Sequence, residues 1–275
     1  MIELPESATL AKQMTKELKG KRIEKVAALK SPHRFAFFCG DPLAYDAMLH
    51  GKAVGETKAY GGHVEIGLED YRLDFNDGIT FKLLAPGEPE PKKHQLYIRF
   101  EDGSALCMSV QMYGAMSAFP AGTSDNPYYL AAREKVSPLA DEFDVDYFRS
   151  LLDSVDRKKT SLKAFLATEQ RIPGLGNGVL QDILWTARLH PKRKLADLGG
   201  QETAELYMAV KNVLADMAGK GGRDTEKDLY GNAGGYKTVM SKNNTQMVCP
   251  GCGGVVKKEA YLGGSVYYCP ACQKL

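Results

Sequence analysis

Four cysteines near the end of the chain form two pairs with the same internal spacing. Cys249 and Cys252 enclose Pro-Gly, Cys269 and Cys272 enclose Pro-Ala, and sixteen residues lie between the pairs. Two thiolates on each of two tight turns can surround one zinc ion tetrahedrally, and a closed four-thiolate site leaves no position open for catalysis. Free or redox-active cysteines are the alternative, but the repeated spacing favours one structural zinc per chain.

A second group of residues that could do chemistry lies at the start of the chain, in Ile2-Glu3-Leu4-Pro5-Glu6. Two carboxylates lie within a few residues of the α-amine, and α-amines in proteins have a pKa near 8, so part of the population is a neutral nucleophile. Such an amine can form a Schiff base with an aldehydic sugar. The alternative is structural: Glu6 supports a helix dipole and Glu3 is solvated.

A glycine-rich run, Pro173-Gly-Leu-Gly-Asn-Gly178, leads directly into a helical pattern. Glycines let the backbone approach a ligand, and a helix start offers unpaired N–H groups, so Gly176 and Asn177 could contact an anion. A plain helix entry capped by Asn177 explains the same residues. The run matches neither the Walker nor the dinucleotide-binding fingerprint.

The elements that must position these groups follow from hydrophobic periodicity and punctuation. Ser7 is expected to cap a helix that ends at Gly20, and short β-like runs fill 23–120, with a hairpin at Asp102-Gly103. Residues 122–138 are expected to be a linker. Helices are expected after Asp144, after Thr160, at 177–188 and at 201–218, followed by a mobile connector over 219–246 and a β-hairpin over 255–268.

Composition sets the broad class. The 275 residues, 44% of them hydrophobic, can fill more than one core, and no long apolar run or signal-peptide layout is present, which predicts a cytoplasmic protein with no membrane partner. Net charge is only +2. Basic residues are locally enriched in 1–34, 188–194 and 239–275, so these segments could converge on a phosphate backbone, or they could be ordinary solvated faces.

The order of these motifs resembles the formamidopyrimidine-DNA glycosylase / endonuclease VIII family. The resemblance spans nearly the whole chain and rests on a Glu-Leu-Pro-Glu start, a β-rich first part, Gly-x-Gly-Asn followed by His190-Pro191, and a final four-cysteine finger. Pro91-Lys-Lys-His94 ahead of the hairpin, and Lys163 with Gln170 ahead of the glycine turn, fit the same order.

The resemblance implies an α+β fold in three domains. These are a β-sandwich-like domain with flanking helices over 1–122, a helix-two-turn-helix domain over 138–220 and a zinc-ribbon hairpin over 243–275. It implies a monomer, associated with the nucleoid, that flips a damaged nucleotide out of duplex DNA, because the target atom is buried in the base stack. The residues that it implies at the site are Ile2, Glu3, Glu6 and His63 for catalysis and Lys93, His94, Tyr113, Lys163, Gly176 and Asn177 for DNA contacts.

This chain also departs from the family pattern. Ile2 stands where the family has an N-terminal proline, and a bulky residue there discourages removal of Met1. His63 replaces a phosphate-contacting lysine and Met112 replaces a wedge arginine. Asn76 or Asp77 occupies the position of an inserted methionine, and Gly264 that of an arginine of the finger. Each of these last four changes removes a positive or apolar contact to distorted DNA.

Three hypotheses follow. The first is a base-excision-repair DNA glycosylase and AP lyase, acting on oxidised purines, oxidised pyrimidines or abasic sites in double-stranded DNA. The second is a DNA lesion-binding module that keeps the clamp with weakened or lost excision. The third is a zinc-ribbon interaction domain on an unrelated enzyme. Salt-dependent binding to duplex DNA without covalent trapping separates the second from the first.

Overall fold

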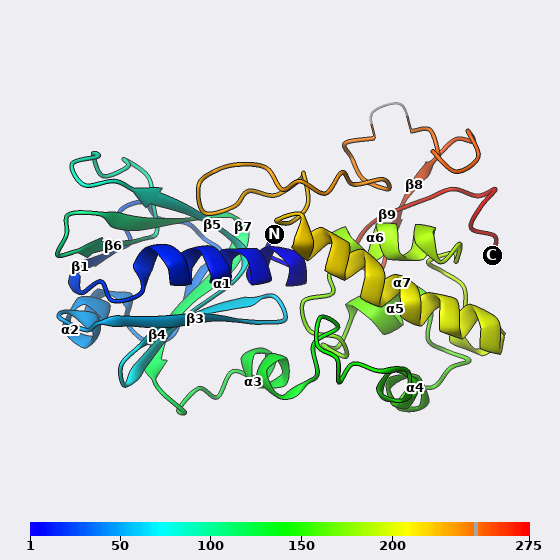
Figure 1. Ribbon diagram of the computed structural model, residues 1–275, viewed down its shortest axis with the longest axis horizontal. Helices are drawn as coiled ribbons and strands as arrows, with labels where there is room; N and C mark the ends of the chain where they lie inside the picture. The colour runs from blue at the N-terminus through cyan, green and yellow to red at the C-terminus, as the bar shows by residue number, and fades with distance from the viewer. Residues whose placement is uncertain (245–246) are drawn as a thin grey trace.

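The computed structural model describes residues 1–244 and 247–275 and has two halves joined end to end. A β-rich half and a helical half lie side by side along the longest axis, and the N-terminus lies at their junction (Figure 1). The halves have separate hydrophobic cores. The mixed architecture predicted from the sequence, with a β-rich part first and a helical part second, is confirmed.

The β-rich half is a seven-stranded sheet in the order β1-β6-β7-β5-β4-β3, with β2 parallel to β7. Its elements are α1 (Leu4–Leu18), β1 (Ile23–Ala28), β2 (Ala36–Phe38), α2 (Tyr45–Leu49), β3 (Val54–Tyr60), β4 (His63–Leu68), β5 (Tyr71–Leu84), β6 (Leu96–Phe100) and β7 (Ala105–Pro120). The predicted hairpin at Asp102-Gly103 is confirmed, since β6 and β7 pair antiparallel across it.

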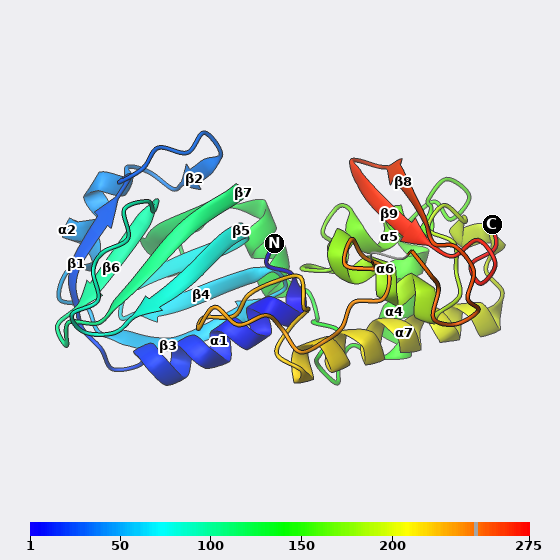
Figure 2. The same ribbon diagram turned by 90° about the horizontal axis from the view of Figure 1, so that it is seen from above.

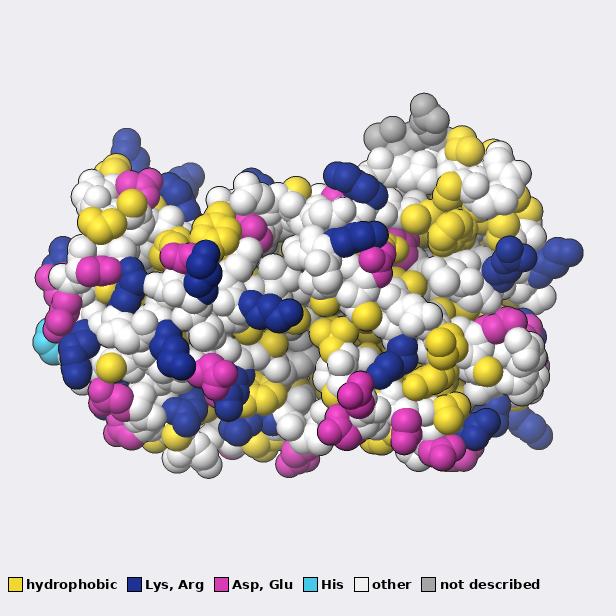
Figure 3. Space-filling model, in the orientation of Figure 1, with side chains coloured by type: hydrophobic (Ala, Val, Ile, Leu, Met, Phe, Trp, Pro, Cys, Tyr) yellow, Lys and Arg dark blue, Asp and Glu magenta, His cyan; other side chains and the backbone are white. Residues whose placement is uncertain are grey.

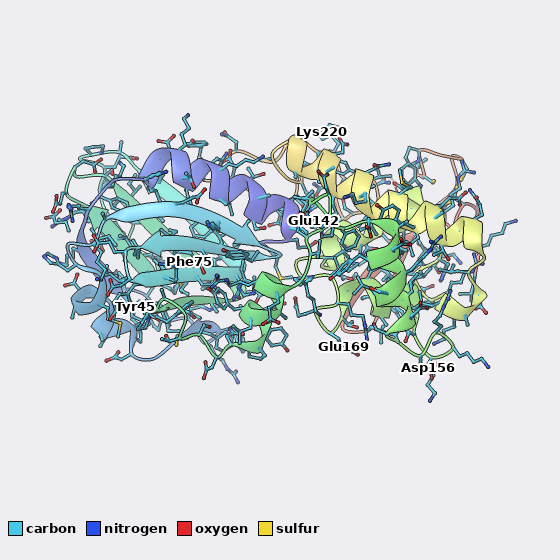
Figure 4. The ribbon with its side chains drawn as sticks, turned by 60° about the horizontal axis from the view of Figure 1, so that its bottom comes forward. Tyr45, Phe75, Glu142, Asp156, Glu169 and Lys220 are labelled. Atoms are coloured by element: carbon cyan, nitrogen blue, oxygen red, sulfur yellow. The ribbon has the colours of Figure 1, made fainter. Side chains whose placement is uncertain are left out.

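Two long strands let this sheet fold over itself. The first part of β5 pairs with β4 and with the end of β7, whereas the second part of β5 pairs with the start of β7, beside β6. The register shifts between Asp77 and Ile79, so the strands bend there, as bulges require. Phe75 and Phe81, on either side of this bulge, pack edge to face in one core, which makes the half sandwich-like. Figure 4 shows Phe75 and Tyr45 inside this half.

Helix α1 carries the first residues from the β-rich half to the junction. Its face with Met14 and Leu18 is buried against β3 and β4. The prediction that Ser7 caps this helix is wrong: Glu3 is the cap residue, and its N–H donates to Oε2 of Glu6 at 3.1 Å. Pro5 sets the first turn, and Ser7 Oγ donates to the carbonyls of Leu4 and Gly61.

The helical half contains α4 (Val145–Asp153), α5 (Leu162–Ala167), α6 (Asn177–Thr186) and α7 (Gly200–Gly219), and α3 (Pro127–Glu134) precedes it. The expected linker over 122–138 therefore holds a helix, capped by Asn126. The helices expected after Asp144 and after Thr160 are α4, capped by Asp144, and α5, capped by Ser161. Gly176, not Asn177, is the cap residue of α6, which corrects the reading of Asn177 as a cap.

Residues 220–241, called the strap below, were expected to be part of a mobile connector. Figure 1 shows the strap, gold to orange, leaving the end of α7, passing over the β-rich half and returning. Gln13 bonds Asp228 and the N–H of Leu229, and the Leu229 side chain is fully buried in the β core. Asp182 accepts the N–H groups of Val239 and Met240. The expectation is wrong for the strap; residues 245–246 lie outside the described part of the chain.

The chain ends in a hairpin of β8 (Lys257–Tyr261) and β9 (Gly264–Tyr268), as predicted. Figure 2 shows this hairpin projecting from the helical half to the same side as β2. On the face seen in Figure 3, Lys and Arg side chains are spread over both halves among Asp and Glu rather than gathered in one band. Within residues 1–244 and 247–275, no helix has the length and apolar character needed to cross a bilayer.

Candidate functional site

A cavity of about 560 Å³ lies where the two halves, the strap and the hairpin meet. Its walls come from β7, α5, α6, the strap and the β8–β9 turn, and the first residues of the chain reach it. Its lining includes Met1, Glu3, Tyr113, Lys163, Asn177, Arg223, Glu226 and Gly264. The fold therefore brings the N-terminal group and the glycine-run group, 175 residues apart, into one site.

Glu3 is held at the start of α6. Its Oε1 accepts from the N–H of Gly178 and its Oε2 from the N–H of Val179, both at 2.8 Å. These are orphan donors of the helix terminus, so a carboxylate from α1 caps α6. Burial raises the pKa of Glu3, and Glu6 adds to this, while Arg223 and the two N–H groups oppose it. Gly176 leaves room for this carboxylate, because a Cβ there would lie 2.7 Å from it.

Glu6 faces Arg223, the first side chain of the strap to enter the junction. The Arg223 guanidinium donates to Oε1 and Oε2 of Glu6 at 3.0 and 2.7 Å, which is bidentate pairing. It also donates to the Met1 carbonyl at 3.2 Å and lies 3.5 Å from Oε2 of Glu3. Burial acts to lower the pKa of Arg223, but the negative charges of Glu3 and Glu6 outweigh the effect of burial, and the pKa is raised. The guanidinium is thus a buried, permanently charged centre.

The α-amine does not contact the predicted carboxylates. Met1 N lies 2.6 Å from Oε2 of Glu226, and both groups are about one-third exposed in the cavity wall. The N–H of Ile2 donates to the Asp77 carbonyl at the β5 bulge, at 2.6 Å. Ile2 nitrogen is therefore an amide in the backbone, and the amine stands one residue earlier.

Asn177 and Lys163 hold the hairpin against the helical half. Asn177 Nδ2 donates to the Ser265 carbonyl at 2.9 Å, and Lys163 Nζ bonds the Tyr261 carbonyl. Burial lowers the pKa of Lys163. At Gly264, an added Cβ would collide with the Asn177 amide, so the absence of a side chain there lets the hairpin turn sit on α6.

The four cysteines converge. Their sulfur atoms all lie within 4.8 Å of one another, with Cys249–Cys272 at 3.8 Å and Cys252–Cys269 at 3.5 Å. A tetrahedral thiolate site with metal–sulfur bonds of about 2.3 Å has sulfur–sulfur edges of about 3.8 Å, so the cluster has the dimensions to hold a metal ion. Trp185 Nε1 donates to Cys249 Sγ at 3.4 Å, which favours its thiolate form.

Two domain models match this chain. The formamidopyrimidine-DNA glycosylase N-terminal domain matches residues 1–127, and the formamidopyrimidine-DNA glycosylase H2TH domain matches residues 135–227. Together they cover most of the chain. The chain belongs to the formamidopyrimidine-DNA glycosylase family. The family predicted from the order of motifs is confirmed.

Relatives in this family match along their whole length. The formamidopyrimidine-DNA glycosylase of Lactobacillus gasseri is 25% identical over 100% of this chain and 99% of its own, and that of Streptococcus pneumoniae serotype 4 is 26% identical with the same coverage. Lactococcus lactis Fpg, solved with abasic-site DNA, has a TM-score of 0.81 at 23% identity, covering 99% of this chain and 100% of its own. MutM, solved with DNA containing carbocyclic 8-oxo-G, has a TM-score of 0.83 at 24% sequence identity, with the same coverage of both chains.

A second cavity of this family member, about 600 Å³, adjoins the first and shares Met1, Glu3, Tyr113 and Asn177 with it. Tyr113 is 38% exposed, and Met112 beside it is 64% exposed. His63, Asn76 and Asp77 line this second cavity. His63 Nδ1 lies 2.9 Å from Oδ2 of Asp74, so this residue, predicted for catalysis at the position of a phosphate-contacting lysine, is already paired on one side.

Lys93 and His94 are not brought to either cavity. The His94 side chain is fully buried, with Nδ1 at 3.0 Å from the Pro91 carbonyl, so this placement does not support the predicted DNA contact. Sequence reasoning missed Arg223. The only local signal is its position in Gly-Gly-Arg-Asp directly after a predicted helix, and its partners lie more than 200 residues earlier.

Proposed function

We propose that this protein binds damaged or abasic duplex DNA and acts on it as a DNA glycosylase with AP lyase activity. The observation that carries the proposal is the meeting of the α-amine, the buried Glu3 carboxylate and the start of α6 at one cavity between the halves. A flipped nucleotide needs such a recess, since its reactive carbon is inaccessible in the stack.

The chemistry follows from an amine and a buried carboxylate that line the same cavity. The neutral α-amine attacks C1′ of the ring-opened sugar, the carbonyl oxygen takes up protons and leaves as water, and an iminium remains. Loss of a proton from C2′ then expels the 3′ phosphate. We propose that Glu3 assists sugar opening and proton transfer, because it is the carboxylate nearest the α6 start. Glu6, fully engaged with Arg223, supports the site from behind.

The contacts to DNA are assigned by chemistry. Lys163 has ammonium hydrogens beyond the one given to Tyr261, and Asn177 has a second amide hydrogen. With the backbone of Gly176, which lines the second cavity, they are assigned to a phosphate where the two cavities adjoin. Tyr113 could fill the space of the vacated base. His63 could meet a phosphate through the ring nitrogen that Asp74 leaves free.

The four cysteines are proposed to bind one structural zinc. When bound, the metal would hold together the two cysteine turns that flank the β8–β9 hairpin. It would thereby fix the position of Gly264 against Asn177. The protein is expected to act as a monomer.

A lesion-binding module with weakened excision is the alternative, and one observation favours it. With Met1 in place, Ile2 nitrogen is an amide bonded to Asp77, and the amine is paired with Glu226. The nucleophile is thus displaced by one residue, up to about 3.5 Å, from where a first-position proline would put it. A misplacement of about 1 Å can already cost on the order of a hundredfold in rate.

An intact-mass measurement after borohydride reduction with abasic-site duplex tests the proposal, since it reports the first residue and any adduct together. The control is the same protein extended by two residues before Met1, which keeps the fold and moves the amine. An adduct with the first protein and none with the second supports the enzyme. Salt-dependent binding without an adduct selects the alternative, and absence of binding overturns both.

A further inference from the structure

The Arg223 guanidinium occupies a space made for it. The residue is 2% exposed; its Nε and Nη2 donate to Glu6 and the Met1 carbonyl, and its Nη1 lies 3.5 Å from Oε2 of Glu3. An ideal Cβ on Gly178 would overlap its Nη1 atom, so the second residue of α6 must lack a side chain for the guanidinium to fit. Its own N–H also bonds Oε1 of Glu6, at 3.0 Å, which fixes the backbone from which it projects.

Charges around Glu3 are unbalanced. Glu3 and Glu6 face a single guanidinium, so that with both carboxyls ionised one negative charge would be in excess in a buried place. Tyr113 on β7 interacts electrostatically with Glu3. Glu226 on the strap and Asp182 on α6 interact electrostatically with Arg223. Burial is the largest influence on Glu3 and raises its pKa; Arg223 is the largest opposing one. Without the guanidinium, only the two N–H groups of α6 would oppose the effect of burial on the pKa of Glu3.

We propose that Arg223 is a positioning residue for Glu3, holding it, Glu6 and the Met1 carbonyl in one buried cluster and favouring the ionised form of Glu3. The inference rests on the proposed function, in which Glu3 takes part in proton transfer. It adds the strap to the machinery, because the charge of a residue at the start of the chain then depends on a side chain 220 positions later.

The test uses two variants, one that changes the formal charge of the cluster and one that removes the guanidinium at the wild-type formal charge. Glu6→Gln leaves Glu3 alone with Arg223, so the cluster becomes neutral. The double variant Glu6→Gln with Arg223→Gln leaves Glu3 without a cation but restores the excess of one negative charge found in the wild type. Charge-matching makes the double variant a fair comparison, since removal of Arg223 alone would leave two uncompensated carboxylates.

Two measurements are made on each protein. One is the pH dependence of borohydride trapping on abasic duplex. The other is a carbon-13 NMR titration of the Glu3 carboxyl, identified by its absence in Glu3→Gln. We expect the Glu3 transition to move to lower pH in Glu6→Gln. In the double variant it should move above the wild-type value, and the two variants should differ by about 1 to 3 pH units.

A Glu3 transition that stays in place in both variants overturns the inference. If the proteins bind DNA without any adduct while the NMR transitions still separate, the enzyme proposal fails and the role of Arg223 in charging Glu3 stands. If the double variant does not fold, Arg223→Lys decides: a lysine keeps the charge without the bidentate geometry, so the Glu3 transition should stay near the wild type. A large upward shift there, with the charge retained, counts against the inference.

Discussion

Replacing Gly178 by alanine tests the packing at the centre of the site. Alanine ordinarily stabilises a helix over glycine by about 1 kcal/mol. Here the new Cβ would overlap the Arg223 guanidinium and lie 2.9 Å from Oε1 of Glu3. The cheapest relief is to displace Arg223 from Glu6, and breaking a buried pair by losing one partner costs about 3 to 5 kcal/mol.

The net expectation is a loss of about 2 to 4 kcal/mol, which at roughly 2 to 4 °C per kcal/mol lowers the melting temperature by about 4 to 16 °C. Thermal unfolding followed by circular dichroism measures it. Gly200→Ala is the matched control, since Gly200 begins α7 and a Cβ there meets no atom within 4 Å. That variant should be neutral or slightly stabilised.

A double-mutant cycle with Arg223→Ala sharpens the test. Once the guanidinium is gone, most of the overlap at Gly178 is gone too, so the cost of Gly178→Ala should fall by more than half. The guanidinium does not occupy the space assigned to it if Gly178→Ala has the same melting temperature as Gly200→Ala. The same holds if Gly178→Ala lowers the free energy of unfolding equally with and without Arg223.

Three further predictions concern the metal, the DNA and the pH. Metal analysis should find one zinc per chain, and chelation should unfold residues 249–272 while the β-rich half stays folded; a metal-free protein with the same hairpin would contradict this. Asn177→Ala should weaken binding to abasic duplex about 5- to 150-fold, on a background that falls steeply with salt; titrations that are unchanged would exclude the site. The Lys21 ammonium and the Ser104 hydroxyl lower the pKa of Asp102 to about 2, so the stability it contributes is present above about pH 4 and is lost as the pH falls towards 2. Asp102→Asn should therefore lower the melting temperature at pH 6 and have a much smaller effect near pH 2.

Local chemistry made part of this molecule predictable. The cysteine pairs, the Asp102-Gly103 turn and the Asp144 cap depend on residues a few positions apart, and the structure confirms the elements that they predicted. Ser7 was misjudged because serine is a good cap in isolation. Pro5 and the bond from the Leu4 N–H to the Gly174 carbonyl start the helix earlier.

The rest depended on distant partners. Glu3 and Glu6 could be selected as reactive carboxylates beside the amine, but their actual contacts, with the α6 start and Arg223, join segments 175 and 217 residues apart. The polar, glycine-rich composition of the strap resembles a mobile connector because composition does not reveal that Leu229 enters a core formed by other residues.

The insertion of Leu229 into the β core bears on the order in which the protein can fold. A ribosome releases the β-rich half long before it releases the strap, so the nascent half has an unfilled place in its core and Glu6 lacks its guanidinium. Contacts of such long sequence separation form slowly. The β-rich half can therefore complete its core only after residue 229 has been synthesised. A chain truncated before residue 229 should contain the residues of both halves but leave the core of the β-rich half incompletely packed.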